Sequence, residues 1–208
     1  MNNPKISFAI PVHNEHEEID RLLTQLIKHK KVEDEIIVQC DQGNTTDNVY
    51  KVLDKYKEHI NVVEFPLNRD FAAFKNNLKN NCSGDWIFQI DADEYPDSYL
   101  IDTVHYFLKE NPETEVFWVP RINTVDGITP THIQKWGWTK DSKGRINFPD
   151  YQCRILQNTP KIQWISKVHE VLYGHTTQAQ LPANEEFCLI HPKSISRQET
   201  QNKFYNTI

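Results

Sequence analysis

Short apolar runs alternate with amphipathic segments along the first half of the chain. The segments between the runs place apolar side chains on one face at helical spacing, as Ile19, Leu22 and Leu26 do. This alternation indicates βαβ units, and therefore an α/β fold with a mostly parallel central sheet and helices on both faces. Strands are expected at residues 7–12, 35–40, 61–65, 85–90 and 116–122, and helices after residue 14 and at 48–59, 71–81 and 98–111.

The first of these helices carries signals at both ends. Asn14 is its predicted N-cap, and Glu17 three residues later would complete a capping box. Residues 28–31 read Lys-His-Lys-Lys, which suits the C-terminal end of a helix dipole. The helix is therefore expected to begin just after Asn14.

After about residue 123 the alternation stops. Residues 123–152 hold turn formers and three of the six glycines, so a long loop region is expected there. We expect one domain over 1–208, with a first half at 1–123 and a smaller region of short strands and loops at 124–208. The short strands are expected at 153–157, 161–165 and 186–190, and the polar tail at 196–208 is expected to be helical.

Composition narrows the class of protein. A formal net charge of -6 gives no overall basic field for binding nucleic acid. The four cysteines are widely separated and form no CxxC, which favours reduced, buried thiols. No apolar run approaches the length of a membrane span, and Pro11 interrupts the short N-terminal run. A cytoplasmic protein is expected, with peripheral membrane contact at most.

The fourth expected strand runs directly into three acidic residues, Asp91, Asp93 and Glu94. Crowded carboxylates repel one another, but they are also the hard oxygen ligands that Mg²⁺ or Mn²⁺ prefers. Asp41 follows the second strand in the same way, and ligands of open α/β sheets bind at the carboxyl ends of the strands. The alternative is an acidic turn that caps a helix starting near Asp97.

The usual phosphate cradles are missing. The sequence has neither GxGxxG after the first strand nor GxxxxGK[ST], which argues against dinucleotide oxidoreductases and P-loop NTPases. A metal that neutralises a nucleoside diphosphate would take their place. This hypothesis requires that Asp91 and Asp93 face a ligand and are not already paired with arginines or lysines.

Three motifs occur in order: "ISFAIPVHNE", "EIIVQCDQGNTTDN" and "NRDFAAFKNNLKNNCSGDWIFQIDADE". Together they resemble the nucleotide-binding half of family 2 glycosyltransferases, which have the GT-A fold and a DxD motif. The later "GW…FPDYQCRIL…W…KVHE" resembles the subgroup that contains lipopolysaccharide-core β-glucosyltransferases. The resemblance implies one GT-A domain, with donor binding in 1–123 and acceptor binding in 124–208.

The same resemblance implies the donor site. Pro11, His13 and Glu15 would line the nucleoside pocket, Asp41 would accept a hydrogen bond from uracil, and Lys75 would lie near the phosphates. The "CDQGN" segment departs from the family's common DDGS or DSGS, with Cys40 in place of the first polar residue.

The resemblance also implies a divalent cation, Mn²⁺ or Mg²⁺. Asp93 would bind it, Asp91 would contact the ribose or the metal, and His191 would reach the metal or the diphosphate.

Two carboxylates compete for the role of general base. Asp150 is slightly favoured because "PDYQCR" resembles the family's pattern of an acid followed by an arginine. Glu170 is the other candidate. The alternative for Asp150 is a helix or turn cap after Pro149. The alternatives for Glu170 are binding of the acceptor or donor sugar, or a structural salt bridge with Arg154 or Lys167.

Three further residues are candidates for the acceptor side. Trp136 and Trp138 could stack on a sugar ring, although packing of the loop on the sheet is the simpler explanation. His169 could contact acceptor, donor or metal, or serve as a structural histidine.

The expected function is inverting, metal-dependent transfer of a sugar to a hydroxyl of a glycan or glycolipid. The donor is a nucleotide diphosphate sugar, and UDP-sugar is the donor favoured. A sugar nucleotidyltransferase and a non-catalytic nucleotide-sugar-binding module remain alternatives.

Overall fold

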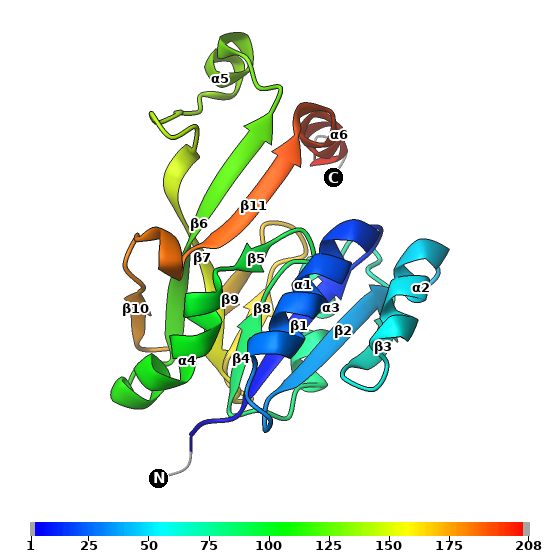
Figure 1. The fold of residues 1–208 in the computed structure, drawn as a ribbon, viewed down its shortest axis with the longest axis vertical. Helices are drawn as coiled ribbons and strands as arrows, with labels where there is room; N and C mark the ends of the chain where they lie inside the picture. Colours follow the sequence, from blue (N-terminus) through cyan, green and yellow to red (C-terminus); the bar gives the residue numbers. More distant parts are fainter. Residues whose placement is uncertain (1–2, 206–208) are drawn as a thin grey trace.

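In a computed structural model, residues 3–205 are described, and they are organised around one large mixed sheet with the strand order β3-β2-β1-β4-β7-β6-β11-β5 (Figure 1). The strands β1, β2, β3 and β4 are mutually parallel, which confirms the α/β fold predicted from the alternating pattern. They span Ile6–Val12 (β1), Glu35–Asp41 (β2), Asn61–Phe65 (β3) and Trp86–Gln89 (β4).

The helices of the first half follow the predicted segments closely. The start of α1 differs, because its N-cap is Glu15 and no side-chain capping bond forms, so the predicted Asn14–Glu17 capping box is wrong. The helices span His16–His29 (α1), Asp47–Lys55 (α2), Phe71–Asn80 (α3) and Ser98–Glu110 (α4).

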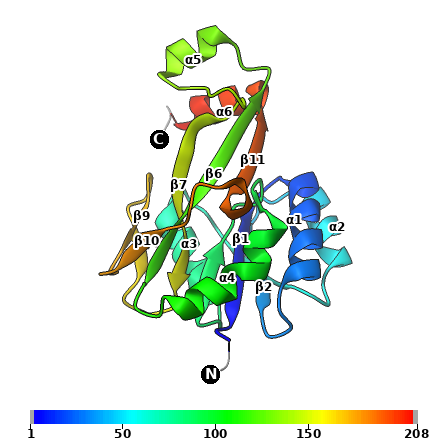
Figure 2. The ribbon, with the colours of Figure 1, turned by 60° about the vertical axis from the view of Figure 1, so that its left-hand side comes forward.

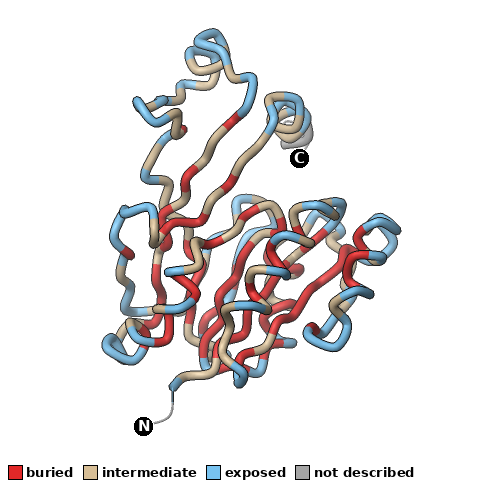
Figure 3. The backbone as a smooth tube through the Cα atoms, viewed as in Figure 1, coloured by how far each residue is buried: buried red, intermediate tan, exposed pale blue. Residues whose placement is uncertain are grey.

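Most of the buried residues lie in the lower body of the molecule, around β1, β2 and β4 (Figure 3). Phe8 of β1 and Phe88 of β4 are fully buried, with their ring centroids 5.8 Å apart. All four cysteines are free and buried, as predicted. Among the described residues, no helix combines the length and the apolar character needed to cross a membrane.

The second half is more ordered than its sequence suggested. β6 (Val116–Asp126) and β7 (Ile146–Gln157) are long antiparallel partners, so the predicted loop over 123–152 is wrong in large part. They extend beyond the lower body as an arm that carries α5 (Pro130–Trp136) at its far end (Figures 1 and 2).

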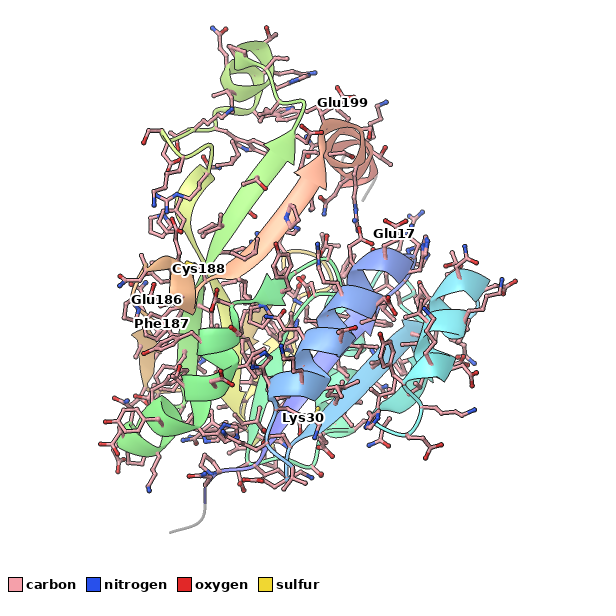
Figure 4. The ribbon with its side chains drawn as sticks, viewed as in Figure 1. Glu17, Lys30, Glu186, Phe187, Cys188 and Glu199 are labelled. Atoms are coloured by element: carbon pink, nitrogen blue, oxygen red, sulfur yellow. The ribbon has the colours of Figure 1, made fainter. Side chains whose placement is uncertain are left out.

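The C-terminal segment returns to the arm. β11 pairs with β6 in parallel and with β5 in the opposite direction, and α6 follows it without a gap. Glu199 on α6 lies above Glu17 at the start of α1 (Figure 4). The remaining elements are β5 (Tyr95–Pro96), β8 (Gln163–Ile165), β9 (Val171–Tyr173), β10 (Gln178–Gln180), η1 (Glu185–Phe187), β11 (Leu189–Ser194) and α6 (Ile195–Tyr205).

Candidate active site

The carboxyl ends of the parallel strands bring the first candidates to one edge of the sheet. Asp41 is the last residue of β2, and Asp91 comes two residues after the end of β4. The buried Asp41 carboxylate accepts a hydrogen bond from the Leu67 N–H at 2.9 Å and another from Asn44 Nδ2 at 3.2 Å. Pro11 is half-buried in neighbouring β1.

A chain of alternating charges begins at Asp91. Arg154 donates from Nη2 to Asp91 Oδ2 at 2.5 Å and to Glu94 Oε1 at 2.6 Å. The same Glu94 oxygen accepts from Arg121 Nη1 at 2.7 Å, and Arg121 also donates to Asp150 Oδ2 at 2.9 and 2.7 Å. Glu94 is fully buried and Arg154 nearly so. The network therefore joins both ends of the loop at residues 91–94, called the DADE loop after its sequence, to β6 and β7.

The charges in this network fix the protonation states. Burial would raise the pKa of Asp91, but Arg154 and Lys75 outweigh it and hold that pKa below its usual value. Burial likewise opposes the ionised form of Asp150, and Arg121 with the hydrogen bonds around it keeps the pKa of Asp150 low. Burial would lower the pKa of Arg154, yet Asp91 and Glu94 raise it. Asp91, Asp150 and Arg154 are therefore ionised at neutral pH.

Asp93 faces a second group of basic side chains, from β11 and α6. His191 Nε2 lies 3.2 Å from Asp93 Oδ2, Arg197 Nη2 lies 3.5 Å from it, and Lys193 Nζ lies 3.9 Å from it. The other ring nitrogen of His191 contacts Asn123 Oδ1 at 2.7 Å. Burial would raise the pKa of Asp93, but these neighbours hold it far below its ordinary value.

The loop between β1 and α1 is tied to the same place. Glu15 accepts backbone hydrogen bonds from His13 at 2.9 Å and Asn14 at 3.0 Å. Its other oxygen lies 3.0 Å from Arg197 Nη2, while Arg197 Nη1 lies 2.7 Å from Glu18. Arg197 thus joins the predicted nucleoside-binding loop to Asp93, and the His13 side chain remains exposed.

Lys75 and Glu170 form an ion pair near Asp91. The Lys75 ammonium also lies 4.4 Å from the centre of the Trp164 ring, and it contributes to the low pKa of Asp91. Both predicted site residues therefore lie close together. His169, the residue before Glu170, has a left-handed backbone conformation with a φ of 55°.

Trp136 and Trp138 lie elsewhere. Their ring centroids are 4.7 Å apart, and Trp136 stacks on His132 at 5.1 Å. This cluster is at the α5 end of the arm, beyond α6 and away from the DADE loop (Figures 1 and 2). The structure therefore does not bring the two tryptophans to the carboxylates.

The predicted metal ligands are brought together only in part. Asp93 and His191 are adjacent, but the Asp91 carboxylate is engaged by Arg154. Residues 3–205 contain no group of three or more His, Cys, Asp or Glu side chains that could hold a metal ion. The condition set by the sequence, that both aspartates be free of arginines and lysines, is not met. The donor set therefore does not fit a divalent cation.

Sequence reasoning missed most of the basic side chains. Arg121 and Lys193 received no role, although both stand in predicted strands or next to them. Arg154 appeared as the arginine of the "PDYQCR" pattern and as a possible partner of Glu170, and Arg197 appeared only as part of a polar tail. The acidic triplet directly after an apolar strand is the signal that could have predicted basic partners. Glu94 of this triplet is fully buried, and a fully buried carboxylate needs a counter-ion.

Comparisons with known proteins bear on the fold and on the family. The TarS fragment 1-349 of S. aureus has a similar fold, with a TM-score of 0.64 and 15% identity over 90% of this chain and 60% of that chain. The complexes of the same fragment with UDP and with UDP-GlcNAc both give TM-scores of 0.56, at 17% and 16% identity over 85% and 88% of this chain. This chain thus spans about 60% of the TarS fragment. No curated protein sequence matches it significantly.

These neighbours establish the GT-A fold, and the sequence model of one family establishes more. The model of "Glycosyl transferase family 2" matches residues 7–172, which run from β1 to β9 and include every carboxylate of the network above. The chain therefore belongs to glycosyl transferase family 2.

Proposed function

We propose that this protein is an inverting glycosyltransferase that moves a sugar from UDP-sugar to a hydroxyl of a glycan or glycolipid. One observation carries the proposal: Asp41, Asp91 and Asp93 lie at the carboxyl edge of the parallel strands of a family 2 domain, with Lys75 near Asp91. Ligands bind at this edge in open α/β sheets. The UDP and UDP-GlcNAc complexes of TarS, which shares the fold, support this donor class.

Finer features belong to the same proposal. The subgroup is that of the lipopolysaccharide-core β-glucosyltransferases, which would place the reaction in cell-envelope or glycan biosynthesis. The protein would work in the cytoplasm, with peripheral membrane contact at a lipid-linked acceptor. Residues 1–123 would bind the donor, and 124–208 would bind the acceptor.

Each donor-site residue has a distinct part. Asp41 would accept a hydrogen bond from uracil, and the loop carrying His13 and Glu15 would cover the nucleoside. Lys75 would leave Glu170 in part to contact a phosphate oxygen. Mn²⁺ or Mg²⁺ was predicted as cofactor, but no step here passes through a metal because the arrangement around Asp93 does not fit one.

The general base is the remaining assignment. Asp150 Oδ2 already accepts bonds from Arg121 and Asn123, its Oδ1 accepts from Gln152, and its pKa is lowered, all of which weaken a proton acceptor. The ion pair between Glu170 and Lys75 uses one Glu170 oxygen, Oε1. We therefore assign proton abstraction to Glu170 in place of Asp150, which the sequence favoured.

A thermal-shift panel of nucleoside diphosphates tests the function. UDP should stabilise the protein more than GDP or ADP, because ligand binding to the folded state raises its stability by mass action. Asp41→Asn should remove the preference for UDP, whereas Asp47→Asn, an exposed acid in the first turn of α2, should keep it. Equal stabilisation by all nucleotides, or by none, would contradict the proposal.

The two alternatives give different products. A binding module would bind UDP-sugar without hydrolysing it, and a sugar nucleotidyltransferase would release pyrophosphate from UTP. Slow release of UDP from UDP-sugar, with no pyrophosphate from UTP, is the result expected of the transferase.

A further inference from the structure

Three basic side chains surround Asp93. His191, Lys193 and Arg197 lie within 3.9 Å of its Oδ2 atom, and all three come from the continuous segment β11–α6. The side chains of Asp93 and Lys193 are 17% and 8% exposed, so water screens these charges only weakly.

This arrangement conflicts with a divalent cation at the same carboxylate. A metal at Asp93 Oδ2 would lie next to a guanidinium and an ammonium group, and like charges repel strongly where screening is weak. Asp91 does not compensate, because Arg154 already holds its carboxylate at 2.5 Å. The residues that a family resemblance assigns to metal binding are thus neutralised by the protein's own cations.

We propose that Lys193 and Arg197 bind and neutralise the donor diphosphate directly, so that this transferase binds UDP and turns over without a divalent cation. The inference rests on the proposed function and adds to it the means of stabilising the leaving group. Asp93 then serves as the counter-ion that holds the two basic side chains in place until the diphosphate arrives.

The geometry around the two cations suits this role. Lys193 Nζ donates to Gln201 Oε1 of α6 at 2.6 Å, which fixes the ammonium group near Asp93. Arg197 is anchored by Glu15 and Glu18, so it stands between the predicted nucleoside-binding loop and Asp93. A diphosphate lies beside its nucleoside, and an arginine fork matches phosphate oxygens well.

The transfer step needs no metal to make or break its bonds or to accept the proton. The sugar C1–O bond to the β-phosphate breaks, and its electron pair leaves with UDP. The acceptor oxygen forms the new bond to C1 from the opposite face, and its proton passes to the Glu170 carboxylate. Lys193 and Arg197 stabilise the negative charge that develops on the departing diphosphate.

Calorimetric titration of UDP in EDTA, and again with Mg²⁺ or Mn²⁺, tests the proposal. The wild type should bind UDP in EDTA, with an affinity that metal changes by less than about threefold. Lys193→Gln and Arg197→Gln should each weaken binding in EDTA by about tenfold or more, since a hydrogen bond to a charged group contributes about 1.5–3 kcal/mol. Lys203→Gln, an exposed cation on the same helix, is the matched control.

The Asp93→Asn variant distinguishes direct binding of the diphosphate by Lys193 and Arg197 from metal-dependent binding. Without the carboxylate, Lys193 and Arg197 lose an internal partner, so UDP binding in EDTA should tighten by about two- to fivefold. A metal-dependent site would instead lose affinity. Binding that appears only with metal and disappears in Asp93→Asn overturns this inference and leaves the proposed function standing. No UDP binding under any condition overturns the proposed function itself.

Discussion

The carboxylate of Glu94 and the guanidinium of Arg154 form a buried ion pair, with 2.6 Å between Oε1 and Nη2. Glu94 is fully enclosed, and its Oε1 atom also accepts a hydrogen bond from Arg121. The pair joins the loop after β4 to the neighbouring strand β7 and its partner β6. The network around it therefore has a structural role as well as a place in the proposed donor site.

Loss of the central carboxylate should destabilise the fold. Glu94→Gln removes the charge that two arginines share, and breaking a buried ion pair from one side costs about 3–5 kcal/mol. We expect a decrease of that size in the free energy of unfolding, measured by urea denaturation. Glu17→Gln, an exposed position on α1, should change it by less than about 0.5 kcal/mol. A Glu94→Gln variant as stable as the wild type would show that the network contributes nothing.

The stability of the protein should fall in acid. Asp91, Asp93 and Asp150 all have pKa values lowered by folding, so the unfolded chain binds more protons than the native state as the pH falls. The stabilisation is complete above the unfolded pKa of about 4 and is lost as the pH falls below it. Urea denaturation between pH 7 and pH 3 should show a plateau above about pH 5, then a decrease. Asp93→Asn should make the decrease shallower, and a constant free energy through pH 3 would refute the assignment.

Kinetics should separate the two candidate bases. Glu170→Gln should lower the rate of UDP-sugar hydrolysis by about 10²–10⁴-fold while the Kd for UDP stays within about threefold. Asp150→Asn should act mainly on stability, because its carboxylate is an acceptor for Arg121 and Asn123. The reverse result, with Asp150→Asn folded, UDP-binding and inactive, would return the role to Asp150.

The thiols should be inert in the folded protein. Burial raises the pKa of Cys82 to about 12 and that of Cys40, Cys153 and Cys188 to about 11. A thiol-specific reagent at pH 8 should therefore label no cysteine rapidly in native buffer and all four in urea. Rapid native labelling of any one of them would mean that its surroundings open readily.

The sequence predicted the first half of the fold because its structure is locally encoded. Strands β1, β2 and β4 are short buried runs, β3 is a short and largely exposed run at the edge of the sheet, and each helix between them has one apolar face, so the periodicity changes at every boundary. The capping box failed because Glu15 bonds the N–H groups of His13 and Asn14 and becomes the N-cap itself. Side-chain competition of this kind leaves no trace in the hydrophobic pattern.

The second half was harder to predict for a physical reason. β6 and β7 are only partly buried where they form the arm, so they lack the continuous apolar runs of central strands. Their pairing depends on contacts between distant residues, such as Arg121 opposite Asp150. The acidic triplet was visible in the sequence, but its partner Arg154 is 60 residues from Glu94, and no local pattern connects them.

The bond between Glu15 and Arg197 spans 182 positions of the chain, and this has a consequence for biosynthesis. During translation the nascent chain can assemble β1, β2 and β4 long before α6 leaves the ribosome, because N-terminal parts emerge first. The loop after β1 therefore has no bond to Arg197 until α6 has been synthesised. A polypeptide halted before Ile195 would therefore hold a formed sheet in which Glu15 lacks its partner Arg197.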